Sequence, residues 1–311
     1  MEEYNEIVEY YKSTLIFKLS GIGYALNCNL LFSNRLSLLP INKCLKLIKY
    51  LKDGDKIFID IGTVIFSTNF TEIVNNINLL NIKINFYLQD EPFVPENIIN
   101  YLLPFSYKIY CTNNNYLHPN VHCMPIGIRD CGITVKPMHD NFYHSYLLNE
   151  GLKNVSKNYL CLIGGMAYIN HPERLVCYNI LKDKPFMFDI SKFNNNLNLT
   201  SSFGNIQVNK YYEYIHQSYY VISPRGGGVD THRFFEIIYL KSIPIVKKTN
   251  TVFDKIYNIF PCLIINEWDD ITVELLKSNL PILQEKINIF YNNYPNFFTD
   301  TSILDNLLLQ T

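Results

Sequence analysis

The sequence predicts an α/β protein of two Rossmann-like domains that face each other across a cleft, with a helical segment at the C-terminal end. Two observations support this fold class. Short apolar, β-rich runs alternate with single helical stretches in both halves of the chain, which is typical of parallel βαβ units. The chain has 311 residues, 48% of them hydrophobic, and a domain usually holds roughly 100–200 residues. We therefore expect one domain over residues 1–140 and a second over residues 141–311.

In the first half, strands are expected at residues 56–61, 81–88 and 107–111, with a helix over residues 70–80 between the first two. After Gly127 the sequence becomes polar and weakly periodic. The connection between the domains is therefore placed within residues 136–158.

The second half repeats the alternation. Its expected helices begin near residue 171 and cover residues 211–217 and 233–240, and the chain is expected to be helical from residue 280 onward. Its expected strands lie at residues 159–163, 186–190, 219–223, 243–246 and 262–265. Ligands of open α/β sheets bind beyond the carboxyl ends of strands, so the chemistry is expected there.

The composition narrows the class of protein. A net charge of −1 with 18% charged residues lacks the basic balance of a nucleic-acid binder. Residues 2–6 are acidic, unlike the start of a signal peptide, and the apolar segment 15–32 is interrupted by Lys18 and two glycines, unlike a membrane span. The eight cysteines include no CxxC pair, which favours buried free thiols in a reducing compartment. We expect a cytoplasmic chain with no membrane span and no nucleic-acid partner.

One segment carries the functional argument: residues 223–236, which read SPRGGGVDTHRFFE. An expected strand runs into a glycine triplet, Gly226, Gly227 and Gly228, and a helix follows for which Asp230 or Thr231 is a good N-cap. Glycines let backbone N–H groups approach a ligand, and a helix N-terminus favours negative charge. Together these features predict an anion-binding site.

Charged side chains flank this segment. Arg225 and Arg233 can bind phosphate in bidentate fashion, and Glu236 lies on the same helix face as Arg233, where it can accept hydrogen bonds from a ribose diol. The segment is neither a G-x-G-x-x-G dinucleotide motif nor a P-loop. A nucleotide-sugar pocket fits this set. The alternative is an ordinary strand-to-helix turn with a surface ion pair between Arg233 and Glu236.

A second strand–glycine–helix sequence is expected at Gly164 and Gly165, and Arg174 lies in the first turn of the helix that follows. Arg174 is a third candidate for a donor contact. A capping or surface role for this arginine is the alternative.

Residues 223–236, followed by 239–246, resemble the pattern of exostosin-like glycosyltransferases, roughly S-P-x-G-x-G-x-D-x-x-R-x-W-E and then a strand G-x-I-P-I-V. Phe235 replaces the tryptophan, and Lys241-Ser242 replaces a small-Gly pair, which alters a helix C-cap and could add a phosphate contact. Further similar stretches follow in family order: LQDEP at 88–92, residues 113–128 with His118-Pro119 and PIGI at 125–128, NHPER at 170–174, and INEWD at 265–269.

This resemblance implies a GT-B glycosyltransferase that holds its donor in the C-terminal domain and moves a sugar to a glycan or protein acceptor. It also implies a UDP-sugar as the preferred donor, inversion of configuration, and no cofactor or metal. The heavy use of Asn, Ile, Tyr and Lys is typical of an AT-rich genome such as that of a large DNA virus, for which the host cytoplasm is the expected location. The donor-binding prediction comprises Gly164, Gly165, Arg174, Arg225, Gly226, Gly227, Gly228, Asp230, Thr231, His232, Arg233 and Glu236.

An inverting transferase also needs a base that deprotonates the acceptor hydroxyl. Asp90 or Glu91, after the expected strand 81–88, is our candidate, and a turn or helix cap is the alternative role for both. Asp60 is a weaker candidate, and His118 and His122 are further ones.

Two other classes of function stay open at this point. A nucleotide-dependent enzyme such as an epimerase would be supported by a nicotinamide fingerprint, which the sequence lacks. A non-catalytic binding homologue would keep the donor site and lack the base.

Overall fold

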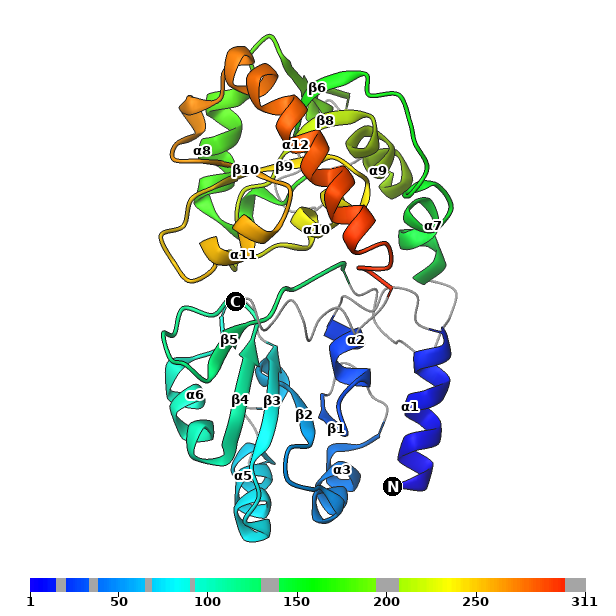
Figure 1. The fold of residues 1–311 in the computed structure, drawn as a ribbon, viewed down its shortest axis with the longest axis vertical. Coiled ribbons are helices and arrows are strands. Elements are labelled where there is room, and N and C mark those ends of the chain that lie inside the picture. Colours follow the sequence, from blue (N-terminus) through cyan, green and yellow to red (C-terminus); the bar gives the residue numbers. More distant parts are fainter. Residues whose placement is uncertain are drawn as a thin grey trace. The chain divides into compact units, whose positions relative to one another are not determined.

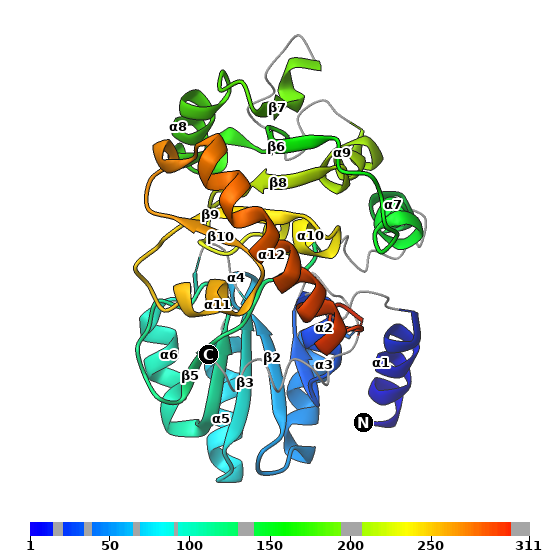
Figure 2. The same cartoon turned by 45° about the horizontal axis from the view of Figure 1, so that its top comes forward.

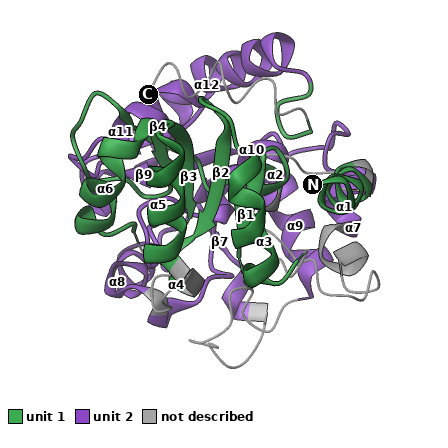
Figure 3. Cartoon of the chain, turned by 90° about the horizontal axis from the view of Figure 1, so that it is seen from below, with its two compact units in different colours: residues 1–137, 296–311 green, residues 138–295 purple. Residues whose placement is uncertain are grey.

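The computed structural model describes residues 1–14, 21–33, 39–64, 69–89, 93–129, 140–193 and 207–299 (Figures 1 and 2). The chain divides into two compact units, unit 1 with residues 1–137 and 296–311 and unit 2 with residues 138–295 (Figure 3). Two α/β units were expected. The C-terminal end differs from the expectation, because residues 296–311 group with unit 1 and not with the second domain.

Unit 1 contains a five-stranded sheet in which every pairing is parallel, with the strand order β1-β2-β3-β4-β5. The strands are β1 (Leu30–Phe32), β2 (Lys56–Asp60), β3 (Ile84–Gln89), β4 (Ser106–Cys111) and β5 (Val121–Cys123). The α-helices are α1 (Glu2–Thr14), α2 (Gly21–Leu26), α3 (Ile41–Leu47), α4 (Ile61–Val64), α5 (Asn69–Leu80) and α6 (Glu96–Leu102), and two short 3-10 helices are η1 (Ile48–Tyr50) and η2 (Leu103–Phe105).

Unit 2 contains a second five-stranded parallel sheet, with the order β10-β9-β8-β6-β7. The strands are β6 (Tyr159–Ile163), β7 (Met187–Asp189), β8 (Ser218–Ile222), β9 (Ile243–Lys247) and β10 (Leu263–Ile265). The α-helices are α7 (Asp140–Glu150), α8 (Pro172–Leu181), α9 (Val208–His216), α10 (His232–Tyr239), α11 (Asp254–Ile259) and α12 (Val273–Asn293). The 3-10 helices are η3 (Tyr168–Asn170), η4 (Ile190–Phe193) and η5 (Trp268–Asp270).

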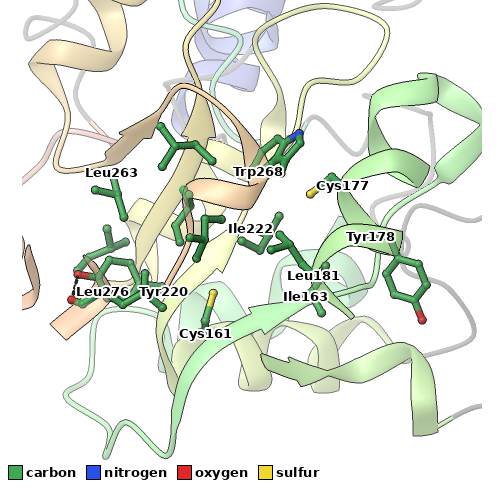
Figure 4. Packing of buried hydrophobic residues seen from close by; sticks show 14 of the residues in the cluster. Cys161, Ile163, Cys177, Tyr178, Leu181, Tyr220, Ile222, Leu263, Trp268 and Leu276 are labelled. Atoms are coloured by element: carbon green, nitrogen blue, oxygen red, sulfur yellow. Dashed lines mark hydrogen bonds between the residues drawn. The ribbon is translucent and has the colours of Figure 1, made fainter. Parts of the chain in front are cut away.

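The core of unit 2 fills one face of its sheet. Alternate residues of β6 and β8, among them Cys161 and Tyr220, pack with Cys177 of α8, Trp268 of η5 and Leu276 of α12 (Figure 4). Side chains alternate between the two faces of a strand, so this cluster uses every second residue. Helices α8 and α12 therefore cover the same face.

The strand order of unit 2 reverses once. From β6 the chain crosses through α8 to β7 at the edge, and then returns through α9 to place β8 on the other side of β6. Crossovers between parallel strands are right-handed, so α8 and α9 lie on opposite faces of the sheet. The carboxyl ends of β6 and β8 thus form a topological switch point, the place where doubly wound sheets bind ligands. Unit 1 shows no such reversal among its described strands.

Seven cysteines of the described chain are buried free thiols, as the sequence indicates, and Cys131 lies outside the described residues. No helix within the described ranges combines the length and apolar character that crossing a membrane requires.

At the amino ends of the unit 2 strands, a buried histidine and two lysines hydrogen-bond neighbouring loops and helix ends. Lys157 Nζ donates to His216 O at 2.7 Å and to Ser242 Oγ at 2.8 Å. Lys241 takes the left-handed φ of 53° at the residue that follows the C-cap of α10, where glycine is usual. Its Nζ donates to Leu152 O at 2.8 Å. The expected phosphate contact of Lys241 is wrong, because this edge is opposite the strand carboxyl ends.

His216 gives this edge a pH dependence. Its Nε2 lies 3.0 Å from Lys153 O and its Nδ1 lies 3.3 Å from the Tyr146 hydroxyl, which fixes the neutral tautomer protonated at Nε2. Burial, and then the charge of Lys157, lower the pKa of His216 from 6.5 to about 4. The unfolded chain therefore binds one more proton than the folded chain between these two values, so acid destabilises the fold.

We expect the free energy of unfolding to fall by about 1–2 kcal/mol between pH 6.5 and pH 5 through His216, at ~1.4 kcal/mol for each pH unit of full protonation difference. The slope of apparent Tm against pH across this range should be smaller in His216→Gln than in the wild type. The matched variant His118→Gln, in unit 1, should keep the slope. An unchanged slope in His216→Gln would contradict this account.

Candidate functional site

Two glycines follow β6 at the switch point, and neither tolerates a side chain. Gly164 and Gly165 have φ values of +100° and +64°, which L-residues rarely adopt. A Cβ on Gly165 would lie 2.8 Å from the ring of Tyr211, and a Cβ on Gly164 would lie 3.2 Å from Asp189 Oδ1. The loop after β6 is therefore fixed by close packing against α9 and the end of β7.

Arg233, in the first turn of α10, joins the two strand ends. Its Nε donates to Ile222 O of β8 at 2.9 Å, and its Nη1 donates to Gly165 O at 3.0 Å and to the Tyr211 hydroxyl at 2.8 Å. The guanidinium carbon also lies 5.5 Å from the centre of the Tyr211 ring. Most of this side chain is thus bound to the protein, so Arg233 positions both loops.

Arg174, in the first turn of α8, makes a second link between the same loops. Its Nε donates to Arg225 O at 2.9 Å, and its Nη1 donates to Ala167 O at 3.0 Å. A Cβ on Gly226 would lie 2.7 Å from Arg174 Nη2, so a side chain there would displace this guanidinium. Arg174 is 8% exposed, which excludes the surface role that the sequence left open.

The charge of Arg233 is buried without a counter-ion. Arg233 is 7% exposed, and in the described ranges no carboxylate oxygen lies within 4.0 Å of its nitrogens. Burying an unpaired charge is costly, and the neutral oxygens that it bonds do not cancel it. A surface ion pair between Arg233 and Glu236 is therefore wrong, since both side chains are buried.

The buried polar atoms of this region that lack a hydrogen-bond partner within the described part of the chain include Arg225 Nε, Arg233 Nη2 and Ser223 Oγ. The carboxylate of Asp230 is buried in the same loop. Native proteins satisfy nearly all buried polar atoms through protein, water or ligand. Two guanidinium N–H groups and one hydroxyl at the end of β8 are suited to the oxygens of an anion.

The start of α10 completes the loop. Thr231 is the N-cap residue by position, but its side chain makes no capping hydrogen bond. Asp230 beside it is buried, and Gly226 N donates to Gly228 O at 3.0 Å across a tight turn that contains Gly227. Since the Thr231 hydroxyl accepts no N–H group of the first turn, the helix N-terminus can still accept an anionic ligand.

Glu236 lies one turn further along α10, before its last turn. It is 3% exposed, and its Oε1 accepts a hydrogen bond from the Tyr212 hydroxyl at 3.2 Å. Tyr211 and Tyr212 of α9 therefore hold Arg233 and Glu236, respectively. The sequence reasoning missed both tyrosines, and its only signal was the expected helix over residues 211–217.

A buried polar cluster at the end of β7 was also missed. Asp189 Oδ2 accepts from the Tyr178 hydroxyl at 2.9 Å, and Asp189 Oδ1 accepts from the Ser191 hydroxyl. The two hydroxyl oxygens lie 2.9 Å apart. In Figure 4 the Tyr178 hydroxyl points away from the apolar cluster. This network borders Gly164 and stiffens the third strand end of the site.

The catalytic candidates Asp90 and Glu91 lie outside the described residues. Asp60 ends β2, is 5% exposed, and accepts a hydrogen bond from Ser33 Oγ at 3.0 Å. His122 stacks on Tyr110 with ring centroids 5.3 Å apart, and His118 Nδ1 accepts from Asn120 N at 3.1 Å. The structure thus brings together the expected donor residues of unit 2, whose roles stay predictions, as does the identity of the base.

Comparisons with known proteins identify no family. No family model matches the sequence, and no curated protein matches it. Among solved structures, an α,α-trehalose 6-phosphate synthase from Burkholderia multivorans is 10% identical, with a TM-score of 0.42 over 99% of this chain and 83% of that chain. A UDP-forming synthase of the same kind from Burkholderia xenovorans is 12% identical, with a TM-score of 0.43 over 87% and 76%. MurG from Acinetobacter baumannii is 13% identical, with a TM-score of 0.34 over 79% and 72%.

The packing of the β6 loop can be tested with two matched glycine substitutions. Gly54 has a φ of +84° and open space around its Cβ position, so Gly54→Ala should cost only the left-handed conformation, about 1–2 kcal/mol. Gly165→Ala adds an overlap with a buried ring and should cost about 3 kcal/mol or more. Denaturant unfolding would give both values, and equal costs would show that the Tyr211 contact is not tight.

Proposed function

We propose that the chain is a glycosyltransferase that holds a nucleotide-sugar, by preference a UDP-sugar, at the switch point of unit 2. The carrying observation is the buried guanidinium of Arg233, which has no counter-ion in the described ranges and lies where the strand order reverses. A diphosphate would supply a counter-charge for this guanidinium and an oxygen acceptor for Arg233 Nη2. The motif of residues 223–236 and its resemblance to exostosin-like glycosyltransferases support a nucleotide-sugar over other diphosphates.

The proposed chemistry needs charge stabilisation and little else from unit 2. When the bond between the sugar C1 and the β-phosphate oxygen breaks, the electron pair stays on that oxygen. Arg225, Arg233 Nη2 and the N-terminus of α10 then stabilise the charge of the leaving diphosphate. Arg174 keeps the two loops at the spacing that this contact requires. Fixed cations supply the stabilisation that a metal ion would otherwise provide, so we propose a metal-independent reaction.

Glu236 is proposed to bind the ribose diol. Its Oε1 accepts one hydrogen bond from Tyr212, and a carboxylate has about four acceptor sites. It lies three positions after Arg233, so the two groups share one helix face at a spacing of about 5–6 Å. That separation suits a ribose next to a diphosphate.

The acceptor is proposed to be a glycan or a protein, with inversion at C1. The base comes from unit 1 in this proposal, with Asp90 or Glu91 as the first candidates and Asp60 as the second. Release of nucleoside diphosphate on addition of an acceptor distinguishes this enzyme from a non-catalytic homologue. A chain that binds the donor tightly and turns over with no acceptor would favour the homologue.

Arg225 is the best single probe of the diphosphate contact. It is half-buried and its Nε has no hydrogen-bond partner among the described residues, so Arg225→Ala should leave the Tm of the free protein unchanged. Its loss should weaken binding of the nucleotide-sugar by about 1.5–3 kcal/mol, roughly tenfold or more in Kd. Calorimetric titration with UDP- and GDP-sugars measures this effect.

Lys182→Ala is the matched control, because it removes one charge at the opposite end of α8, and it should bind as the wild type does. Arg174→Ala should lower the Tm of the free protein, since it breaks the two links between the loops. Wild-type affinity in Arg225→Ala would refute the proposed diphosphate site.

If Glu236 binds the ribose diol, a substitution there should affect the binding of two ligands differently. Glu236→Gln should weaken binding of the nucleotide-sugar roughly tenfold, because a charged hydrogen bond to the diol is lost. It should not weaken binding of inorganic pyrophosphate, which has no ribose. Equal losses for both probes would mean that the substitution disturbs the loop and that Glu236 does not recognise the sugar diol.

A further inference from the structure

His171, a residue that the sequence reasoning left without a role, lies at the same switch point. It is the N-cap of α8, and its Nδ1 accepts the backbone N–H of Glu173 at 3.2 Å. A backbone N–H can only donate, so Nδ1 carries no proton and the neutral ring is protonated at Nε2. The cap bond therefore fixes both the orientation of the ring and the position of its N–H group.

The ring lies beside the β8 loop. Arg174, three residues after His171, donates to Arg225 O at 2.9 Å, so the first turn of α8 contacts residues 225–226. Burial and the charge of Arg225 lower the pKa of His171, Glu173 opposes this change, and Arg174 adds to it. Because the ordinary pKa of histidine is already near 6.5, this lowering keeps the ring neutral near pH 7.

The half-exposed ring thus adds an N–H donor beside a loop that already holds two guanidinium groups. Arg225 Nε and Arg233 Nη2 are buried there without a hydrogen-bond partner in the described chain. The N-termini of α8 and α10 meet the same loop from two sides, and both favour negative charge. One anion with several oxygens would satisfy all of these groups together.

We infer that His171 is a further catalytic residue of the donor site, whose Nε2–H donates a hydrogen bond to the β-phosphate of the nucleotide-sugar. This inference rests on the proposed function. In the reaction, the acceptor oxygen forms the new bond to C1, and the acceptor proton passes to the base. The bond between C1 and the phosphate oxygen breaks with its electron pair on that oxygen, and His171 keeps its proton while it stabilises the new charge.

The substitution His171→Asn isolates this role. Asparagine is among the best N-cap residues, so its Oδ1 can accept the Glu173 N–H and preserve the start of α8. It is too short to place a donor where Nε2 lies. His171→Ala removes both functions and should lower the Tm, whereas His171→Asn should leave the Tm near that of the wild type.

The decisive measurement is the Kd of each variant for UDP and for UMP, which lacks the β-phosphate. We expect His171→Asn to bind UDP about tenfold more weakly than the wild type and to bind UMP within about twofold of it. Equal losses for the two nucleotides, or wild-type affinity for UDP, would overturn the inference. If the wild type itself binds neither UDP nor a nucleotide-sugar, the proposed function fails, which is a different outcome.

Discussion

The site depends on one buried cation. The guanidinium of Arg233 bonds the last carbonyl of β8, the carbonyl of Gly165 after β6 and the hydroxyl of Tyr211 on α9. A buried charge is tolerated only when its hydrogen bonds are well made, so these three elements cannot shift independently. The reversal of strand order brings the two strand ends together, and this side chain fixes the distance between them.

Two glycines leave space for the side chains that pack around these loops. Gly165 leaves room for the Tyr211 ring, and Gly226 leaves room for the guanidinium of Arg174. The cost of this arrangement is a buried guanidinium, that of Arg233, with no described carboxylate oxygen within 4.0 Å of its nitrogens. Such a site is less stable empty than filled, because a ligand that binds only the folded state stabilises it by mass action. Tight backbone geometry and unsatisfied donors are thus two consequences of one constraint.

The sequence predicted what repeats locally and missed what depends on distant contacts. The alternation of apolar runs located β6 and β8 to within a residue, and the spacing of Arg233 and Glu236 predicted one helix face. Strands β1 and β5 have three residues each, too few for a periodic signal. The tyrosine hydroxyls that hold Arg233 and Glu236 lie 22 and 24 residues away in sequence, so no motif connects them. The bonds of Arg174 to two main-chain carbonyls could likewise be learned only from the fold.

Both units bury polar side chains at the carboxyl ends of their strands, but the chemistry of these side chains differs. In unit 2 the carboxyl ends of the strands hold buried arginines, which suit a diphosphate. In unit 1 they hold Ser33, Asp60, Thr112, Asn113 and Asn114, all at most 5% exposed. Hydroxyl and amide groups with a single carboxylate do not attract an anion, and they match the hydrogen-bonding groups of an uncharged sugar or peptide. The proposed donor site therefore lies in the unit whose described strand ends hold buried arginines.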